Sequence, residues 1–280
     1  MYTCNKKGRA FMTTVLTFSN FKGGTGKTTN STMTGIELAR RGYKTLLIDL
    51  DPQANATNLY LKTKENKTGD LVTFKETLMA GIKSQNIKAT IINIVDNLDV
   101  LPSSADFALY PRYMETVKKD YSERVKYLSQ MISEWKGEYD YILIDVPPTI
   151  SLITDSALYA TDYAVIVLQT QERSLQGAEA FIRYLQDTLI NQFHAPTLDV
   201  AGILPVLLKN GAPVDLSTLS KAETMFGKEN MFKTTIKNME RLKRYDVTGV
   251  TFKDQFDRAV QEVYKNVVDE LLSRISEESL

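Results

Sequence analysis

The chain has 280 residues, of which 43% are hydrophobic, and this is enough to build the core of one large α/β domain. Its 34 basic and 34 acidic residues give a formal net charge of zero, so any binding to nucleic acid has to come from a local patch. The one cysteine, Cys4, excludes an internal disulfide and a cysteine-based metal cluster, and no apolar run reaches the ~20 residues that span a membrane.

Residues 1–12 are predicted to form a disordered tail, and residues 13–280 a single domain. The tail carries Lys6, Lys7 and Arg9 before a short apolar stretch, a pattern that weakly resembles a signal peptide. That stretch runs directly into the first predicted strand, so cleavage there would remove part of the fold. We therefore expect a cytoplasmic protein.

Short apolar runs rich in β-branched residues alternate with helix-like segments along the chain. This alternation predicts an α/β fold with a mostly parallel, twisted sheet and helices on both faces. The predicted strands cover residues 15–18, 45–48, 141–144, 164–168 and 200–204, with weaker patterns at 98–101 and 231–236. The predicted helices cover residues 28–41, ended by Gly42, and residues 174–189 and 216–226. The polar stretch 62–97 is interpreted as an insertion with one possible helix at 74–82.

A glycine-rich segment, NFKGGTGKTT at residues 20–29, lies between the first predicted strand and the first predicted helix. This is the context of a phosphate-binding loop, whose backbone N–H groups and helix N-terminus surround an anion. Gly23, Gly24 and Gly26 lack the side chains that would keep the backbone from wrapping around phosphates. Lys27 supplies an ammonium group for the outer phosphates, and the Thr28 hydroxyl is placed to bind Mg²⁺. The alternative is a glycine-rich turn before an ordinary helix, which does not explain why strand, loop and helix coincide.

Two positions of this loop differ from the ordinary pattern GxxxxGK[ST]. Phe21 occupies the place of the first glycine, and a second lysine, Lys22, follows it. By spacing alone, Lys22 is explained equally well as solvated surface charge and as a residue with a special role.

Three aspartates follow two of the predicted strands. Asp49 and Asp51 end the segment LLIDLD, and Asp145 ends YILID. At a two-residue spacing along a strand, Asp49 and Asp51 point to the same side. Because α/β proteins bind ligands at the carboxyl edge of the sheet, these carboxylates are predicted to hold a cation or a water, with Asp145 as the Walker B residue. An Asp-Pro turn is the alternative for the first pair.

With FKGGTGKTT, LLIDLDPQANAT and YILIDVPP in this order, the chain resembles the ParA/Soj family of deviant Walker A ATPases in the MinD/ParA superfamily. Further similar stretches are NLDVLPSS at 97–104, SLQG at 174–177 and AGILP at 201–205. The resemblance implies a P-loop NTPase fold and hydrolysis of ATP to ADP and phosphate with Mg²⁺, weak alone and stimulated by a partner. It also implies an ATP-sandwich homodimer that associates with the nucleoid, binds nonspecific DNA and drives plasmid or chromosome partition with a ParB-like or small centromere-binding adaptor.

The resemblance also implies roles for individual residues. Lys22 matches the signature lysine, which reaches across the dimer to the partner subunit's phosphates and acts like an arginine finger. Lys27 matches the general phosphate lysine, and Asp51 matches the residue that positions the attacking water. The implied magnesium site is Thr28, with Asp49 and Asp145 as outer supports. The implied nucleotide-binding set is Lys22, Gly23, Gly24, Thr25, Gly26, Lys27, Thr28 and Thr29.

The chain departs from the family in three places. Thr25 stands where many relatives have valine, a change that the loop should tolerate. After AGILP, relatives often show Asp-x-Arg-Thr, whereas residues 209–212 read KNGA and lack that arginine. The segment IKNMER at 236–241 only resembles the relatives' IPRNVR, which leaves the adenine contacts unassigned.

Positive charge is concentrated in residues 221–253, which contain eight basic and four acidic side chains. Such a stretch can bind the DNA backbone without reading its sequence, although a solvated surface explains the same charge. Arg241, Lys243 and Arg244 are the predicted DNA contacts, and Lys209 is a weaker one.

A membrane-positioning ATPase similar to MinD is the alternative within the superfamily, because such relatives end in a basic amphipathic helix. Residues 253–280 carry a helical apolar stripe, but they contain four basic and seven acidic side chains. Anionic lipid would repel this segment, so the stripe is predicted to pack against the sheet, and no membrane binding is expected. The stripe consists of Phe256, Val260, Val263, Tyr264, Val267, Val268, Leu271 and Leu272.

Overall fold

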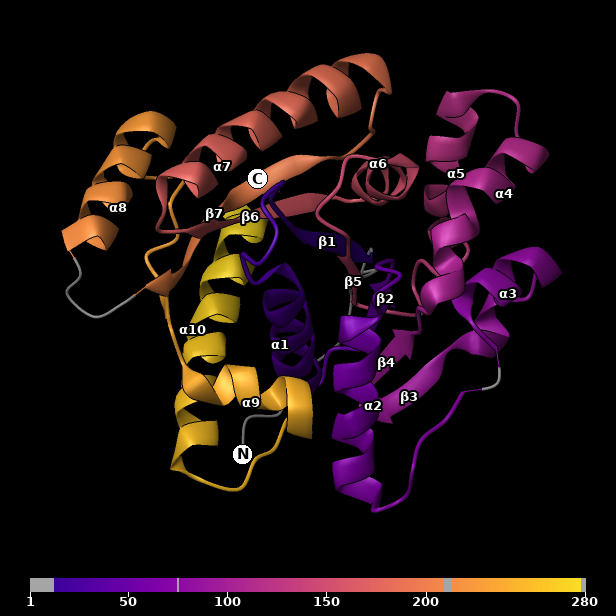
Figure 1. Ribbon diagram of the computed structural model, residues 1–280, viewed down its shortest axis with the longest axis horizontal. Helices are drawn as coiled ribbons and strands as arrows, with labels where there is room; N and C mark the ends of the chain where they lie inside the picture. Colours follow the sequence, from indigo (N-terminus) through magenta and orange to yellow (C-terminus); the bar gives the residue numbers. More distant parts are fainter. Residues whose placement is uncertain (1–12, 75, 209–212, 278–280) are drawn as a thin grey trace.

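The structure, a computed structural model, describes residues 13–74, 76–208 and 213–277. The predicted tail at residues 1–12 and the predicted DNA contact Lys209 lie outside these ranges. The described chain is built on an eight-stranded sheet in the order β3-β4-β2-β5-β1-β6-β7-β8 (Figure 1). The strands are β1 (Thr14–Ser19), β2 (Thr45–Asp49), β3 (Ile92–Val95), β4 (Leu98–Leu101), β5 (Tyr141–Asp145), β6 (Tyr163–Gln169), β7 (Asp199–Leu208) and β8 (Ile236–Lys237). Only β3 runs antiparallel to its neighbour among these strands.

Helices cover both faces of the sheet, as predicted. In Figure 1 the layer that includes α1 and α10 lies below the central strands, and the layer that includes α6 and α7 lies above them. One layer consists of α1 (Lys27–Arg40), α2 (Asn55–Thr68), α9 (Glu240–Thr248) and α10 (Gln255–Glu277). The other consists of α3 (Leu78–Ser84), α4 (Tyr110–Val117), α5 (Tyr121–Ser133), α6 (Leu152–Tyr159) and α7 (Glu172–Tyr184), with α8 (Pro213–Phe226) beside α7. Short helical turns occupy Ile87–Thr90, Ala105–Leu109 and Leu185–Gln192.

The central strands are continuous apolar runs because the sheet buries both of their faces. In β2, Leu46 and Ile48 pack into the core on the α3–α7 side, and Leu47 packs into the core on the α1–α10 side. Buried parallel strands are typically apolar without alternation, which is why the sequence pattern identified them. The five predicted strands and the weaker one at 98–101 are confirmed.

The interpretation of residues 62–97 as an insertion is wrong. Residues 55–68 form α2, whose buried side includes Leu59 and Tyr60, and residues 92–95 form the edge strand β3. The helix predicted at 74–82 begins later, at Leu78, because the Thr77 side chain accepts a hydrogen bond from the Ala80 N–H and caps the helix there. This stretch therefore completes one end of the sheet and its cover.

The strand predicted at residues 231–236 is also wrong for most of its length. Met231 forms an isolated bridge with Ile203, and only Ile236 and the residue after it form a strand. Between them, the backbone N–H groups of Lys233 and Thr234 donate to the carboxylate of Glu270 in α10 at 2.7 and 2.8 Å. These donors are satisfied by a side chain, so no strand ladder forms there.

The helices that were predicted differ from the observed ones mainly at their ends. The first helix is one residue offset from its predicted range, and Gly42 follows it with a positive φ of 88°, as a helix stop requires. The helix predicted at 174–189 begins at Glu172, and its second half is the wider helical turn at 185–192. Five helices, α2, α4, α5, α6 and α9, have no counterpart in the sequence prediction, and each has 8 to 14 residues.

The apolar stripe of α10 packs against the sheet, as predicted. Val260, Tyr264, Val267, Val268 and Leu271 are all at most 1% exposed. The one clear exception is Phe256, which is 57% exposed at the start of the helix. None of the described helices has the length and apolar character needed to cross a membrane.

Candidate nucleotide-binding site

The glycine-rich segment forms the turn between β1 and α1, at the carboxyl end of a strand that lies between β5 and β6. Gly24 and Gly26 adopt positive φ angles of 72° and 85°, a conformation that residues with a Cβ atom rarely adopt. Gly26 is the N-cap residue of α1, and no side chain caps this helix end. The first N–H groups of α1 thus offer a site for an anion inside the loop.

The two lysines of the loop have different surroundings. Lys27 is buried, and its Nζ donates to the backbone carbonyl of Lys22 at 3.1 Å, inside the loop. The Nζ of Lys22 lies on the outer side, where it donates to the side-chain carbonyls of Gln169 at 3.2 Å and Gln171 at 2.5 Å. One ammonium group is therefore inside the turn, and the other is outside it, against the end of β6 and the start of α7.

The loop is tied to β6 and α7 by polar contacts. The Asn20 side-chain amide donates to the carbonyl of Val167 at 2.9 Å, and its Oδ1 accepts the backbone N–H of Lys22 at 3.0 Å. Gly177 of α7 lies directly against this asparagine, because a Cβ at that position would approach the Asn20 Oδ1 to 2.9 Å. The glycine in SLQG therefore permits the close approach of α7 to the loop.

Phe21, which replaces the first glycine of the usual pattern, is a second attachment of the loop to α7. Its ring packs edge-on against Phe181, with centroids 5.1 Å apart, and against Tyr184, at 5.2 Å. The Tyr184 hydroxyl in turn donates to Asp155 of α6. Sequence reasoning missed this role. The available signal was two aromatic residues spaced three apart on the predicted helix.

Asp49 and Asp145 lie opposite each other in the register of β2 and β5, and both are fully buried. Asp49 is occupied by protein donors: its Oδ1 accepts the Asp51 N–H at 3.0 Å, and its Oδ2 accepts the Thr57 N–H and hydroxyl at 2.8 and 2.7 Å. The half-buried Asp51 accepts the N–H of Gln53 at 2.9 Å. Asp49 thus fixes the loop that presents Asp51.

Asp145 has one buried oxygen without a protein partner. Its Oδ1 accepts a hydrogen bond from Ser31 at 3.4 Å, whereas its Oδ2 has no hydrogen-bond partner among the described residues. Burial and the neighbouring charge of Asp49 raise the pKa of Asp145, and the Thr28 hydroxyl and the charge of Lys27 oppose that shift. Burial lowers the pKa of Lys27, and the charge of Asp145 opposes that shift in turn. This buried carboxyl oxygen is therefore open to a bound cation or water.

The residues present fit a magnesium ion that is held partly by a ligand. No group of three or more His, Cys, Asp or Glu side chains in the described ranges is placed to hold a metal alone. Mg²⁺ usually binds through one or two carboxylates together with substrate phosphates and water. Asp145 next to a phosphate-binding loop matches that donor set.

A pocket of about 80 Å³ adjoins the loop on the side of α9 and α10. Its floor at the loop is made by Thr25, Gly26, Thr29 and Asn30. The remaining lining comes from β7, the segment around β8, α9 and α10, namely Val206, Leu207, Ile236, Asn238, Met239, Leu242, Lys243, Asp246 and Tyr264. The sequence left this part of the site unassigned, and the only signal was the position of IKNMER.

Asn30 connects the loop to the C-terminal helix. Its side-chain amide donates to the Gly26 carbonyl at 2.8 Å, and its Oδ1 accepts the Tyr264 hydroxyl at 3.1 Å. Both Asn30 and Tyr264 are buried. A tyrosine of α10 thus supports the turn that surrounds the anion site.

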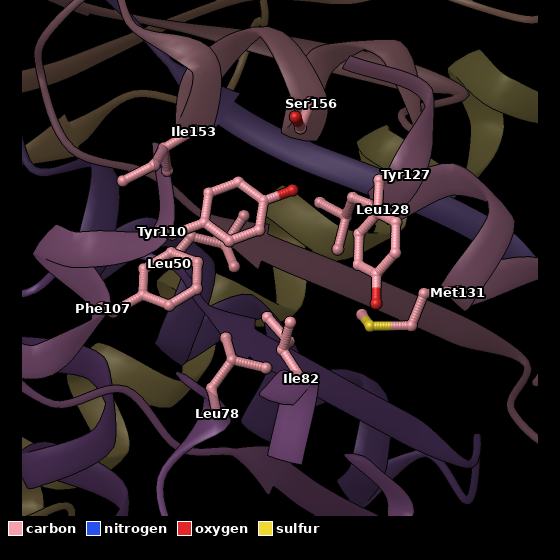
Figure 2. Close-up of a pocket in the computed structure, with 10 residues that line it drawn as sticks. All are labelled: Leu50, Leu78, Ile82, Phe107, Tyr110, Tyr127, Leu128, Met131, Ile153 and Ser156. Atoms are coloured by element: carbon pink, nitrogen blue, oxygen red, sulfur yellow. The ribbon is translucent and has the colours of Figure 1, made fainter. Parts of the chain in front are cut away.

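A second cavity is lined by Leu50, the residue that follows β2, and by side chains of the α3–α7 layer (Figure 2). Its volume of about 10 Å³ is that of a single water probe, and its lining is mainly aliphatic and aromatic. In Figure 2 the Tyr110 hydroxyl points across it toward Ser156. This cavity is too small for a nucleotide and belongs to the core of the α3–α7 layer.

The predicted DNA contacts on α9 are not equivalent. The Arg241 side chain is 15% exposed, pairs with Asp254 and lies 3.5 Å from Asp257. Lys243 and Arg244 are exposed, and Lys243 pairs with Glu240 at 3.1 Å. The structure therefore separates an arginine that joins α9 to α10 from two basic residues on the surface of α9.

The fold and the loop define a P-loop NTPase with a second lysine in its phosphate loop. Residues 13–198 match a family described as an AAA domain. The chain is 30% identical to the sporulation initiation inhibitor protein Soj of Bacillus subtilis (strain 168) over 236 residues, which are 81% of this chain and 85% of Soj. It is also 30% identical to the chromosome partitioning protein ParA of Myxococcus xanthus over 241 residues, 86% of this chain and 81% of that protein.

The fold also matches a solved structure. A putative plasmid partition protein from Borrelia burgdorferi B31, bound to AMPPNP, superposes with a TM-score of 0.73 and 22% identity, covering 94% of this chain and 99% of that one. The sequence relatives establish the family: the chain belongs to the ParA/Soj family of P-loop ATPases.

Proposed function

We propose that the chain is a Mg²⁺-dependent ATPase that closes as an ATP-sandwich homodimer, binds nonspecific DNA on the nucleoid and moves a plasmid or chromosome with a ParB-like or small centromere-binding adaptor. Residues 13–280 form the single ATPase unit of this proposal. The observation that carries it is the arrangement of the two lysines, with Lys27 inside the phosphate loop and Lys22 outside it. One subunit uses only the inner lysine on its own nucleotide.

The nucleotide lies along the loop in this proposal. Its phosphates accept the N–H groups of residues 23–29 at the start of α1, where Lys27 adds positive charge. Its base enters the pocket of about 80 Å³ between the loop and α9. The exposed Asn238 and the Asp246 side chain supply hydrogen-bonding groups there, and Met239 and Leu242 supply apolar contact.

The implied magnesium ion is held by Thr28 and Asp145, with Asp49 in support. When bound, it neutralises charge that develops on the transferring phosphoryl group. The residues of the chain contribute by positioning the reacting groups. Asp49 fixes the backbone of Asp51 and Thr57, and Asp51 orients the attacking water. Phosphoryl transfer depends mainly on such positioning and on charge, so a lysine delivered by a partner subunit raises turnover and couples it to dimerisation.

The DNA surface is proposed on α9, where Lys243 and Arg244 are exposed. Arg241 remains a predicted DNA contact, and its guanidinium group also pairs with Asp254 and Asp257. The double variant Lys243→Ala with Arg244→Ala is expected to weaken DNA binding and to reduce its salt dependence, with ATP affinity changed by less than about threefold. An unchanged DNA-binding isotherm would show that these two residues are not part of the DNA-binding surface.

The rival within the superfamily is a MinD-like ATPase that acts at a membrane. Its apolar helix would have to face lipid, whereas five residues of the α10 stripe are buried in the core. The test of the proposal is retention of the protein on DNA with ATP, ADP or no nucleotide at several salt concentrations, beside vesicles of anionic lipid. ATP-dependent, salt-sensitive DNA retention supports the partition function. Vesicle binding without DNA retention would instead support the MinD-like function at a membrane.

A further inference from the structure

We propose that Gln169 and Gln171 are positioning residues that hold the Lys22 ammonium group on the outer side of the phosphate loop, ready for the nucleotide of a second copy of the chain. The inference rests on the proposed function, because it assumes an ATP-dependent sandwich dimer. It adds two residues that lie outside every motif discussed above.

The two glutamines belong to rigid parts of the fold. Gln169 is the last residue of β6, and Gln171 is the N-cap residue of α7. The Gln169 backbone N–H donates to the Ser174 hydroxyl at 3.2 Å, and the Gln171 N–H donates to the Gln169 carbonyl at 2.7 Å. The acceptors that Lys22 meets are therefore fixed by the backbone beneath them.

The backbone of Lys22 is fixed as well. Asn20 accepts its N–H at 3.0 Å and is itself bonded to β6, and Gly177 allows α7 to lie against that asparagine. Lys22 is thus anchored at both ends. Its backbone carbonyl accepts a hydrogen bond from the Lys27 ammonium group, and its own ammonium group donates to the two glutamines.

The glutamines orient the ammonium group without neutralising it. No carboxylate forms an ion pair with Lys22 within the described ranges, and Glu172, the acidic residue next to Gln171, is paired with Lys221 at 2.9 Å. The N-terminus of α7 carries partial positive charge, which would repel a lysine that had no acceptors there. The two amide oxygens therefore explain why the ammonium group stays beside this helix end and keeps its full charge for phosphate.

Prior ordering matters because a lysine has a long, flexible side chain. A lysine that docks from a disordered state loses rotamer freedom, and ordering it before association lowers that loss. Without the glutamines, the ammonium group has no acceptor in this position and its side chain samples many orientations. We therefore expect their removal to weaken dimerisation and to leave nucleotide binding by one subunit unchanged.

The test compares the double variant Gln169→Ala with Gln171→Ala against wild type and against Gln176→Ala, an exposed glutamine on the same helix. Sedimentation with AMPPNP and Mg²⁺ measures dimerisation, and a fluorescent ADP analogue measures binding by the single subunit. The double variant is expected to raise the dimer dissociation constant about tenfold, the scale of the ordering of one long side chain. Its ADP affinity and thermal unfolding should match wild type, as should every property of Gln176→Ala.

A single variant tests whether one acceptor is enough. Gln169→Ala keeps the neutral amide oxygen of Gln171 for Lys22 and should retain most of the dimerisation that the double variant loses. Equal or tighter dimerisation by the double alanine variant would overturn the inference, as would an equal loss of ADP affinity. A wild-type protein that stays monomeric with AMPPNP would instead overturn the proposed function, and this inference with it.

Discussion

The phosphate loop and the pocket beside it share Thr25, Gly26 and Thr29, but the chain builds them in different ways. The loop is one run of ten residues whose binding groups are mainly backbone N–H groups and one buried lysine. The pocket draws its lining from β7, β8, α9 and α10 as well as from the loop, and its binding groups are side chains. Backbone groups recognise any phosphate, whereas side chains in a pocket discriminate between ligands.

This difference predicts how substitutions should behave at the two ends of the site, where the loop is the phosphate end and the pocket is the pocket end. Changes at the phosphate end should abolish binding or turnover, because few groups there have substitutes. Changes at the pocket end should alter affinity in small steps, because many side chains share the contact.

The largest effect is expected for Asp145→Asn, which removes the buried carboxylate at the phosphate end. Turnover with Mg²⁺ and ATP should fall about 100- to 1000-fold, the scale seen when one charge-stabilising group is lost from an active site. Steady-state phosphate release measures this. Full turnover by the variant would exclude Asp145 from the magnesium site.

The same variant should make the nucleotide-free protein more stable. Burial raises the pKa of Asp145, so ionising this group costs more free energy in the folded protein than in the unfolded chain. The contribution of this group to the free energy of unfolding is favourable below the ordinary pKa of an aspartate. It is lost as the pH rises toward the pKa of Asp145 in the folded protein. Thermal unfolding without Mg²⁺ should therefore show a higher midpoint for Asp145→Asn at pH 7 and little difference at pH 4.

Lys27→Ala should come next, with ATP affinity lowered about 100-fold through the loss of a charge-assisted hydrogen bond to phosphate. Lys243→Ala is the matched control, because this lysine lines the pocket end and its side chain is 60% exposed. Its effect should stay below about threefold. Titration with a fluorescent ATP analogue compares the two, and equal losses would contradict the distinction between the ends.

Phe21→Ala should lower the free energy of unfolding by about 2 kcal/mol, less than for a fully buried phenylalanine, because the ring is partly buried. Urea unfolding followed by circular dichroism measures this. Phe21→Leu keeps most of the apolar contact and should recover about half of the loss. No change in the urea midpoint of Phe21→Ala would show that the ring does not attach the loop to α7.

Tyr264→Phe should have the smallest effect, about 1 kcal/mol of unfolding free energy, because it removes one buried hydrogen bond to Asn30. It tests the residue that joins the two ends, so ATP affinity should fall by a few fold and ADP affinity by the same factor. If Tyr264→Phe lowered ATP affinity more than Lys27→Ala does, the phosphate end would not be the more important end for binding.

The features that the sequence predicted correctly are those made by neighbouring residues. The buried strands are continuous apolar runs, and the phosphate loop is a contiguous segment, so both were visible before the structure. α2 was missed because its large apolar residues, Leu59, Tyr60 and Leu61, are consecutive and form no helical stripe. The strand predicted at 231–236 failed because Glu270, more than thirty residues later, takes its backbone donors.

The unpredicted parts of the site depend on residues that are far apart in the chain. Neither Gln169 nor Gln171 belongs to a recognisable motif, and they matter only because β6 lies beside β1. Arg241 was predicted from charge alone, and its pairing with Asp254 and Asp257 depends on how α9 folds back on α10. Its role in DNA binding stays a prediction.

The bond between Tyr264 and Asn30 also has a consequence for biosynthesis. The two residues are 234 positions apart, so the ribosome makes the phosphate loop long before it makes the helix that supports it. A nascent chain with α10 still inside the exit tunnel has the loop sequence but lacks this support and the last wall of the pocket. We therefore expect nucleotide to bind more weakly to a chain whose α10 has not yet emerged than to the finished subunit.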